Sequence, residues 1–290
     1  MMERLEAFAG RKDSRTEGVF PLIGVYDVFS ATIAANHFDG IFLSGFGFAA
    51  SFYGLPDIGF LPWPEVVAFA QRVRTVLPDR YLLVDIDDGY ADVNVACHVV
   101  SLLESIGASG VVLEDQKRPR RCGHFNGKQI LDLEEYLVKL KKVLGTRRAL
   151  DVVARTDASD IGEIRKRAMA FAEAGADAIL IDGQKDLSLF RELRSKIDRP
   201  LVFNQIAGGK SPSHSFRELK EAGISVAVYS TPCLFAAQSA MDDAMKSILQ
   251  RGGHLPEGGK NAVGIHECTA ILDENLARRD SRNTRAFNFR

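Results

Sequence analysis

The chain has 290 residues, 46% of them hydrophobic, and a formal net charge of −1. This apolar content is too high for a disordered chain, and the balanced charge provides no general attraction to nucleic acid. The charged N-terminus argues against a secretory signal, and no run of about 18 apolar residues predicts a transmembrane helix. We therefore expect a globular, cytoplasmic protein that binds neither nucleic acid nor membranes.

Eight short apolar runs predict β-strands, and most are continuous, as in strands that are covered on both faces. They lie near 20–25, 40–44, 81–85, 110–114, 150–154, 178–182, 200–204 and 225–229. Helical patterns separate them at 29–36, 64–77, 93–106, 133–144, 161–174, 187–197, 215–222 and 232–250. This alternation predicts a closed (β/α)8 TIM barrel. The alternative is an open doubly wound sheet, against which no G-x-G-x-x-G motif follows the first strand.

The end of the chain departs from this repeat. Residues 251–260 predict a turn-rich linker, 261–279 an extra amphipathic helix, and 280–290 a polar, frayed tail. The predicted domains are a catalytic barrel at 1–250 and a C-terminal segment at 251–290. We expect the extra helix to pack on the barrel or on a neighbouring subunit.

The chain has four cysteines whose wide spacing matches no zinc motif: Cys97, Cys122, Cys233 and Cys268. Reduced thiols in the cytoplasm are therefore the default expectation. Cys97 and Cys233 fall in helical patterns and are predicted to be small core residues.

Polar side chains stand at the ends of several predicted strands, where a barrel carries its active site. These residues are Asp85, Glu114, Arg155, Asp182 and Asn204. A single Asp at such a position is more often a helix cap or turn former. Five polar residues that converge on one rim are harder to explain in that way and indicate a functional site.

Asp85, Asp87 and Glu114 offer the carboxylate oxygens that Mg²⁺ or Mn²⁺ prefers. Because Mg²⁺ usually keeps several waters, we expect Asp85 to bind it directly or through one water. Asp87 and Glu114 would mainly hold metal-bound waters. Asp88 is expected either to cap the helix that follows or to add charge to the site.

Two further stretches could receive a substrate. Arg155 could clamp a carboxylate or phosphonate through two parallel hydrogen bonds, and the alternative is an ion pair with Asp157 or Glu114. Residues 44–47 follow the second strand, and their backbone N–H groups could bind a carboxylate or an oxyanion.

Residues 115–132 form a long connection without a predicted element, which is typical of a lid. The basic run at 117–121 is either a solvated loop or a feature that attracts an anionic substrate. Cys122 follows this run, and the arginines and His124 are expected to lower the pKa of its thiol and to place a proton nearby. The alternative is an incidental surface thiol.

In combination these stretches resemble the isocitrate lyase and phosphoenolpyruvate mutase superfamily, from about residue 24 to about residue 253. The matching stretches are Gly24-Val25-Tyr26-Asp27, Ser44-Gly45, Gly54-Leu55-Pro56-Asp57-Ile58-Gly59, Asp85-Ile86-Asp87, Leu113-Glu114-Asp115-Gln116, Arg121-Cys122-Gly123-His124, Ala154-Arg155-Thr156-Asp157-Ala158 and Asn204 with Gly208-Gly209-Lys210. The resemblance implies a barrel whose C-terminal helix is often swapped between subunits, in homotetramers that are dimers of dimers.

The resemblance also implies roles for individual residues. Mg²⁺ would bind through Asp85, with Asp57, Asp87 and Glu114 around its water shell. The substrates would be 2-oxo or 2-hydroxy acids, with Arg155 at the α-oxyacid end and Asn204 at the other end. The implied substrate-binding set is Ser44, Gly45, Phe46, Asp57, Arg155 and Asn204.

The Cys-Gly-His sequence separates activities within the superfamily. Lyases that cleave a C–C bond carry it, and the residue matching Cys122 protonates the departing carbanion; Arg155 and His124 complete the implied catalytic set. Phosphoenolpyruvate mutases typically lack it, but a carboxyphosphonoenolpyruvate mutase branch keeps it. We therefore favour a Mg²⁺-dependent lyase acting on a small 2-hydroxy dicarboxylate, with a phosphonomutase that acts on a P–C bond as the alternative.

Several positions depart from the superfamily pattern. The usual residues are Thr at 88, Gly-Asn at 91–92, His at 112, Tyr at 42, and Glu at 182 and 207. This chain has Asp88, Ala91, Asp92, Val112, Phe42, Asp182 and Ala207 at these positions. The departures leave the substrate open and motivate a third hypothesis, a catalytically silent barrel kept for binding or assembly.

Overall fold

Eight parallel strands close into a barrel in the order in which they occur along the chain. The computed structural model describes residue 5 and residues 14–255 and 263–287. The strands are β1 (Phe20–Val25), β2 (Gly40–Leu43), β3 (Tyr81–Asp85), β4 (Gly110–Glu114), β5 (Asp151–Thr156), β6 (Ala178–Ile181), β7 (Leu201–Gln205) and β8 (Val226–Tyr229). Because β1 pairs with both β2 and β8, the predicted closed barrel is confirmed and the open sheet is wrong.

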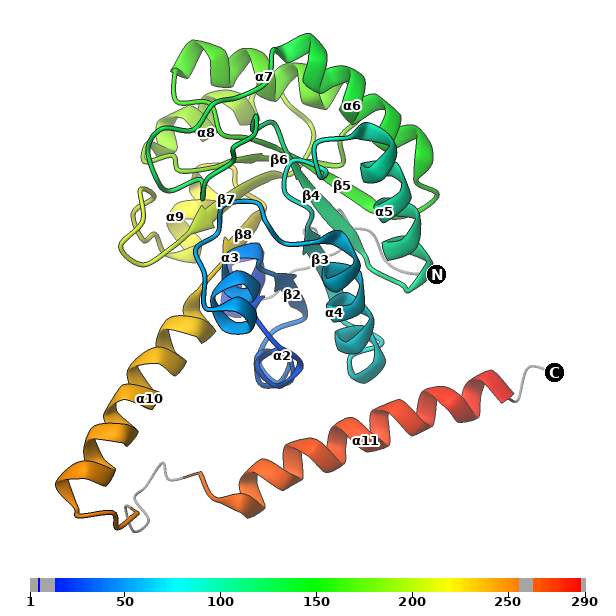
Figure 1. Ribbon diagram of the computed structural model, residues 1–290. Helices are drawn as coiled ribbons and strands as arrows, with labels where there is room; N and C mark the ends of the chain where they lie inside the picture. Colours follow the sequence, from blue (N-terminus) through cyan, green and yellow to red (C-terminus); the bar gives the residue numbers. More distant parts are fainter. Residues whose placement is uncertain (1–4, 6–13, 256–262, 288–290) are drawn as a thin grey trace.

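Helices surround the barrel (Figure 1). They are α2 (Val28–Ala35), α4 (Trp63–Val76), α5 (Val93–Ser105), α6 (Leu133–Thr146), α7 (Ile161–Glu173), α8 (Leu187–Arg194) and α9 (Phe216–Glu221), whereas α10 (Pro232–Gln250) follows β8 and extends away from the barrel. A 3-10 turn at Ser14–Thr16, the short α3 (Gly45–Phe48) and a π-helical turn at Ala49–Tyr53 were not predicted. The predicted bounds of the eight strands and of these eight helices agree with the structure to within three residues.

The strands are apolar because both of their faces are buried. One set of side chains packs inside the barrel, and another packs between the strands and the helices. Phe42 and Val112, two of the departures from the superfamily pattern, lie in the interior set and are 5% and 1% exposed. Apolar packing thus fills two positions where relatives commonly carry polar side chains.

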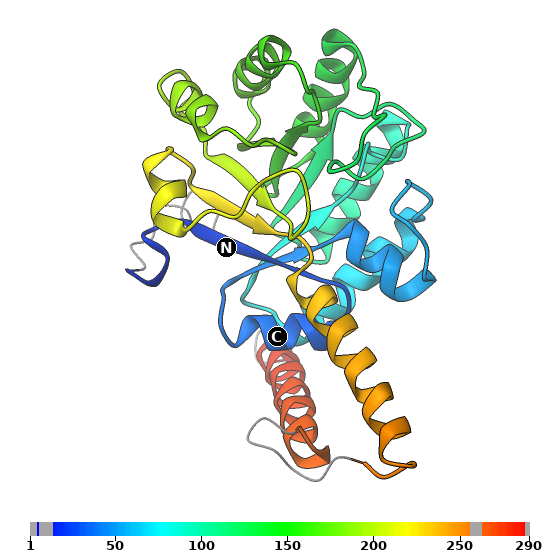
Figure 2. The same ribbon diagram turned by 90° about the vertical axis from the view of Figure 1, so that its left-hand side faces the viewer.

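The C-terminal segment leaves the ring of barrel helices (Figure 2). Helix α10 has no buried residue along its length, and α11 (Ile265–Phe287) packs against α4. Thr32 and the buried Asn275 hydrogen-bond through their side chains at 2.9 Å and 3.2 Å, which ties α11 to α2. The helix continues beyond residue 279 to Phe287, so the predicted frayed tail is wrong over that stretch.

Parts of the predicted linker and tail, residues 256–262 and 288–290, lie outside the described residues, and the domain boundary at 250 stays a prediction. In the part of the chain that the structure describes, no helix is long and apolar enough to cross a membrane. The cysteines are free, and Cys97 and Cys233 are half-buried against the core. The cytoplasmic location also stays a prediction.

Candidate active site

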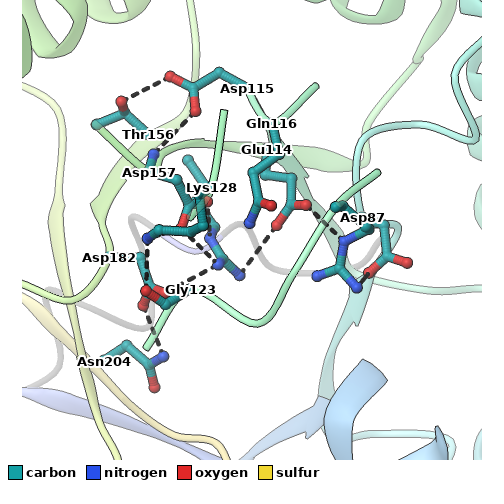
Figure 3. Close-up of polar contacts among 12 residues, drawn as sticks. Asp87, Glu114, Asp115, Gln116, Gly123, Lys128, Thr156, Asp157, Asp182 and Asn204 are labelled. Carbon is teal, nitrogen blue, oxygen red and sulfur yellow. Dashed lines mark hydrogen bonds and ion pairs between the residues drawn. The ribbon is translucent and has the colours of Figure 1, made fainter. Parts of the chain in front are cut away.

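A cluster of carboxylates at the ends of β3 and β4 surrounds one buried arginine. Arg120, from the segment between β4 and α6, is 1% exposed. Its Nε donates to Glu114 Oε1 at 2.8 Å, and its Nη1 pairs with Asp57 and lies 3.3 Å from Asp87 Oδ1. Figure 3 labels Asp87 and Glu114 and marks their contacts with dashed lines. Arg120 was not predicted as a site residue, because its only signal in the sequence is its place in the basic run before Cys122.

This cluster has too little positive charge for its carboxylates. Burial raises the pKa of Asp85 and raises that of Asp87 well above the ordinary range, against the attraction of nearby arginines. Burial likewise raises the pKa of Glu114 to about 7, although Arg120 and Arg155 both favour its ionised form. A further cation would therefore stabilise the ionised cluster.

The carboxylates fit a hard divalent cation in their chemistry. Asp87 Oδ1 and Glu114 Oε2 are buried without a hydrogen bond, and such oxygens are costly unless a ligand satisfies them. A Cβ placed on Gly45 would lie 3.2 Å from Asp85 Oδ2 and 3.4 Å from Asp87 Oδ1, so the backbone at the start of α3 lies close against these carboxylates. Among the described residues, however, no three or more His, Cys, Asp and Glu side chains are grouped to hold an ion directly.

The loop that presents Asp87 is strained. Asp87, Tyr90 and Ala91 have φ of 50°, 62° and 67°, a region that L-residues rarely adopt and that often marks functional loops. Ala91 stands where the superfamily usually has Gly, so the departure adds strain there. Asp92 caps α5 by accepting from Asn94 N at 2.7 Å.

Asp88 has neither of its two expected roles. The cap of α5 is Asp92, and both oxygens of the Asp88 carboxylate pair with Arg118. Its charge is therefore neutralised by the neighbouring loop and does not add to the acidic cluster.

Arg155 lies at the end of β5 and is held by carboxylates. Its Nε and Nη2 donate to Asp157 at 2.9 Å and 3.0 Å, and Nη2 donates to Asp182 at 2.9 Å. Nη1 is 3.4 Å from Glu114 Oε2. The alternative interpretation of Arg155 as an ion-pair residue is thus observed, and its contact with a substrate stays a prediction. Figure 3 shows this network continuing to Asn204.

Asp182 and Asp157 differ from the acidic cluster, because the pKa of each is lowered rather than raised. Burial alone would raise the pKa of Asp182, but Arg155, followed by His124 and Asn204, outweighs it and holds that pKa far below the usual range. Burial is outweighed in the same way at Asp157 by Arg155 and Lys128, so its pKa is also lowered. Both carboxylates are therefore ionised anchors rather than proton carriers.

His124 and Asn204 meet above β7. His124 Nδ1 accepts from the backbone N–H of Lys210 at 2.9 Å, and its Nε2 is 3.5 Å from Asp182 Oδ1. Asn204 Nδ2 donates to Asp182 at 2.8 Å, and Asn204 Oδ1 accepts from Ser230 at 2.7 Å. The His124 imidazole thus fastens its loop to the rim.

The thiol of Cys122 is less acidic than the sequence predicts. Burial raises the pKa of its thiol to about 11, and this outweighs the hydrogen bond from the His124 backbone N–H and the attraction of Arg155. The prediction of a lowered pKa is therefore wrong, as is the alternative of an incidental surface thiol, since Cys122 is 9% exposed. A sheltered thiol that stays protonated suits a proton donor rather than a nucleophile.

The lid, residues 115–132, lies directly on the rim. A Cβ at Gly123 would collide with the carboxylate of Asp182, and a Cβ at Gly209 would collide with the His124 ring. Lys128 Nζ donates to Asp157 at 2.7 Å. Glycine between Cys122 and His124 therefore lets the backbone of the lid approach the strand ends.

The predicted acceptor stretch forms the start of α3. Ser44 caps this helix by accepting from Gly47 N at 3.1 Å. Phe46 is half-buried and packs edge-on against Phe235 of α10, with the ring centres 6.3 Å apart. Ser44, Gly45 and Phe46 thus lie beside the acidic cluster, and their contact with a substrate stays a prediction.

Comparison with known proteins shows the family. The family model described as phosphoenolpyruvate phosphomutase matches residues 12–249. The chain belongs to the isocitrate lyase and phosphoenolpyruvate mutase superfamily. The superfamily's 2-methylisocitrate lyase of Bacillus subtilis is 33% identical to this chain over 270 residues, covering 90% of this chain and 86% of that protein.

Other superfamily members are similar to a comparable degree. The chloroplastic carboxyvinyl-carboxyphosphonate phosphorylmutase of Arabidopsis thaliana is 33% identical over 266 residues, covering 89% of this chain and 78% of that protein. The crystal structure of 2,3-dimethylmalate lyase matches with a TM-score of 0.82 at 27% identity, covering 89% of each chain. The superfamily thus contains both activities considered for this chain.

Proposed function

We propose that this protein is a Mg²⁺-dependent carbon–carbon lyase. It would cleave a small 2-hydroxy dicarboxylate to a 2-oxo acid and a second carboxylic acid, or a hydrated 2-oxo dicarboxylate to two carboxylic acids. The observation that carries the proposal is Cys122, a sheltered thiol whose pKa of about 11 keeps it protonated beside the rim. The similar lyases support the same activity.

The proposed metal-binding residues are Asp85, Asp87 and Glu114, with Asp57 nearby. Mg²⁺, or Mn²⁺ in its place, would polarise the 2-oxygen of the substrate as a Lewis acid. The oxygens of Asp87 and Glu114 that lack a hydrogen bond support this assignment. Arg155 would contribute positive charge to the same α-oxyacid end.

The proposed reaction is a retro-aldol or retro-Claisen cleavage. A base takes the hydroxyl proton, the 2-oxygen becomes a carbonyl, and the electron pair of the C2–C3 bond passes to the departing carbon. Cys122 then gives its thiol proton to that carbon. His124 would position the donor, because its ring holds the lid on Lys210 and Asp182.

The surroundings of the site favour a dicarboxylate over a more highly charged substrate. A cavity of about 470 Å³ lies between the loop that follows β7 and the start of α10, and all of its lining residues are uncharged. They include Ala207, where lyases commonly carry Glu. A third carboxylate would find no cation among these residues, so we propose that the distal part of the substrate is apolar or neutral.

The decisive test is a screen of 2-hydroxy dicarboxylates for release of a 2-oxo acid, with Mg²⁺ and with a chelator. Cys122→Ser should lower kcat about 10³-fold while substrate binding largely survives. Cys97→Ser, a half-buried thiol on α5, is the matched control and should keep wild-type kcat. Wild-type turnover by Cys122→Ser would overturn the proposed acid.

A phosphonomutase remains the second candidate because the similar phosphorylmutase matches as much of the chain as the lyases do. It would rearrange a P–C bond in a small phosphonate. Phosphorus NMR of candidate phosphonates incubated with the protein separates the two activities. New phosphorus signals would favour the mutase, whereas a lyase leaves the spectrum unchanged.

We also propose a homo-oligomer in which α10 of one subunit covers the barrel of another. An apolar cavity of about 740 Å³ opens between α2 and α9, at the root of α10. Phe29 and Ile33 on α2 line it and are 37% and 41% exposed. Helix α10 carries Met241, Met245 and Leu249 exposed along its length, an apolar surface suited to that cavity.

Light scattering after size-exclusion chromatography tests this assembly, and a dimer of dimers is expected. Ile33→Asp places a charge in the cavity and should shift the protein towards monomers. Val138→Asp on α6, at a residue that is 68% exposed, is the matched control and should leave the mass unchanged. A monomeric wild-type protein would overturn the proposed assembly.

A further inference from the structure

Asp88 and Arg118 form an ion pair with two hydrogen bonds, which joins the loop between β3 and α5 to the lid. Arg118 Nε donates to Asp88 Oδ2 and Arg118 Nη2 donates to Asp88 Oδ1, each at 2.8 Å. Arg118 Nη1 also donates to the carbonyl of Gly59 at 2.8 Å. Parallel bonds of this kind fix both distance and orientation, so one side chain fastens the lid to two separate segments of the barrel.

The two partners differ in how firmly they are held. The Asp88 side chain is 2% exposed, its carbonyl accepts from Lys139 Nζ at 2.9 Å, and its Oδ1 accepts from Tyr90 N at 3.2 Å. The Arg118 side chain is 38% exposed. Asp88 is therefore the fixed acceptor of the pair, and Arg118 is the exposed donor that water can reach and release.

We infer that Asp88 and Arg118 form a latch that holds the lid shut over the acidic rim. Arg118 precedes Cys122 by four residues in the lid, so the lid cannot lift Cys122 away without straining or breaking this pair. Threonine, the usual superfamily residue at position 88, cannot make the two-bond contact. The departure at Asp88 thus adds one contact that must break before the lid opens, beside those of Arg120, His124 and Lys128, and Asp88 and Arg118 are positioning residues.

This inference deepens the proposed function, because the lid carries the proposed acid, but its test needs neither substrate nor metal. The rate at which iodoacetamide alkylates Cys122, followed by mass spectrometry of the Cys122 peptide, reports opening of the lid. Arg118→Gln should raise that rate about fivefold, which is the change expected when one of the stronger solvent-exposed ion pairs is lost. Asp88→Asn and Asp88→Thr should raise it similarly, and Arg118→Lys should lie between them and the wild type.

Arg121→Gln is the matched control, because it removes the same charge from an exposed side chain of the same lid. Its alkylation rate should equal that of the wild type. The double variant Asp88→Asn/Arg118→Gln should be no faster than either single variant, since both changes break one latch. Cys97 serves as an internal reference for general loosening of the fold.

Three results would overturn the latch: equal rates in Arg118→Gln and Arg121→Gln, multiplied effects in the double variant, or equal acceleration at Cys97. The latch and the lyase proposal fail separately. A protein that shows the expected alkylation pattern but cleaves no 2-hydroxy acid keeps the latch and loses the lyase. In an active lyase, the latch variants should also change kcat and KM by different factors, as expected when opening of the lid limits turnover.

Discussion

Glu114 and Asp115 are consecutive and fully buried, yet they belong to two different groups of side chains. Glu114 faces Arg120 and Arg155 at the rim, and its Oε2 has no hydrogen bond. Asp115 turns towards α7, where Arg167 Nη1 donates to it at 3.0 Å. Its Oδ1 accepts from Asp157 N at 2.9 Å and its Oδ2 from Thr156 Oγ1 at 2.7 Å. Figure 3 shows Asp115 bonded to Thr156 and Asp157, on the side away from Glu114.

The difference separates a structural acid from a candidate functional one. The protein itself satisfies both oxygens of Asp115, so this side chain needs nothing from outside the fold. Glu114 keeps an oxygen for a ligand, and burial raises its pKa to about 7. An altered pKa alone does not distinguish the two, because burial also raises that of Asp115 to about 6. Hydrogen bonds that remain unmade are the better guide to function.

Removing the arginine of each group should give the largest effect. Arg120→Met leaves buried carboxylates without their counter-ion, and Arg167→Met does the same to Asp115. We expect each to lower the free energy of unfolding by about 3–5 kcal/mol in EDTA at pH 8. Mg²⁺ should recover a large part of this loss only in Arg120→Met, because a cation can replace that guanidinium. Urea unfolding with and without Mg²⁺ measures this. Equal recovery in both variants would remove the distinction between the groups.

The pH dependence of stability without metal should come next in size. The folded pKa of Glu114 is about 7 against an ordinary 4.5, and that of Asp115 is about 6 against 3.8. The folded protein therefore keeps protons that the unfolded chain has released. The stability that Glu114 and Asp115 contribute is therefore fully present below their unfolded pKa values and is lost as pH rises through the folded ones. The share of Glu114 is on the order of 3 kcal/mol.

Urea unfolding in EDTA between pH 4.5 and pH 8 tests this slope. Glu114→Gln should remove a larger share of the decline than Asp115→Asn, and the remainder should come from Asp85 and Asp87, whose pKa values burial also raises. Mg²⁺ should flatten the wild-type curve, since it binds the ionised cluster, but should leave the share of Asp115 unchanged. A curve that Glu114→Gln does not alter would show that Glu114 titrates normally.

The sequence could predict which residues meet at the rim, because that depends only on topology. Parallel strands in a closed barrel bring their carboxyl ends together whatever the exact bounds. For this reason Asp85, Glu114, Arg155, Asp182 and Asn204 were found from short apolar runs alone. The predicted strand positions needed to be correct only to within a residue or two.

The sequence could not predict what the lid does, because a loop has no periodicity to read. Arg118, Arg120 and Arg121 look alike in the sequence, yet one is a latch, one enters the acidic cluster and one is exposed. The pKa of Cys122 was predicted with the wrong sign for the same reason. Neighbouring charges can be counted along the chain, whereas burial, which dominates here, depends on the folded loop.

Replacing the two acids themselves should separate activity from stability. Glu114→Gln should lower kcat up to about 100-fold, as for residues that support a metal site, with stability in EDTA maintained. Asp115→Asn should keep kcat within about threefold and lower stability by about 1–3 kcal/mol, because buried donors lose their acceptor. Steady-state kinetics and urea unfolding on both variants check this. A large loss of activity in Asp115→Asn alone would reverse the assignment.

The smallest effect is expected at Glu163, the exposed member of the group formed by Asp115 and Arg167. Glu163 Oε1 accepts from Arg167 Nε at 2.7 Å within α7, and its side chain is 33% exposed. Glu163→Gln should lower stability by less than about 0.5 kcal/mol, because half-exposed pairs four residues apart in a helix contribute little. Arg167 would still be held by Asp115 and by the carbonyl of Leu131. Urea unfolding at low and at high salt measures this, and a loss above about 1.5 kcal/mol would mean that the Arg167 group depends on its surface contact rather than on its buried bonds.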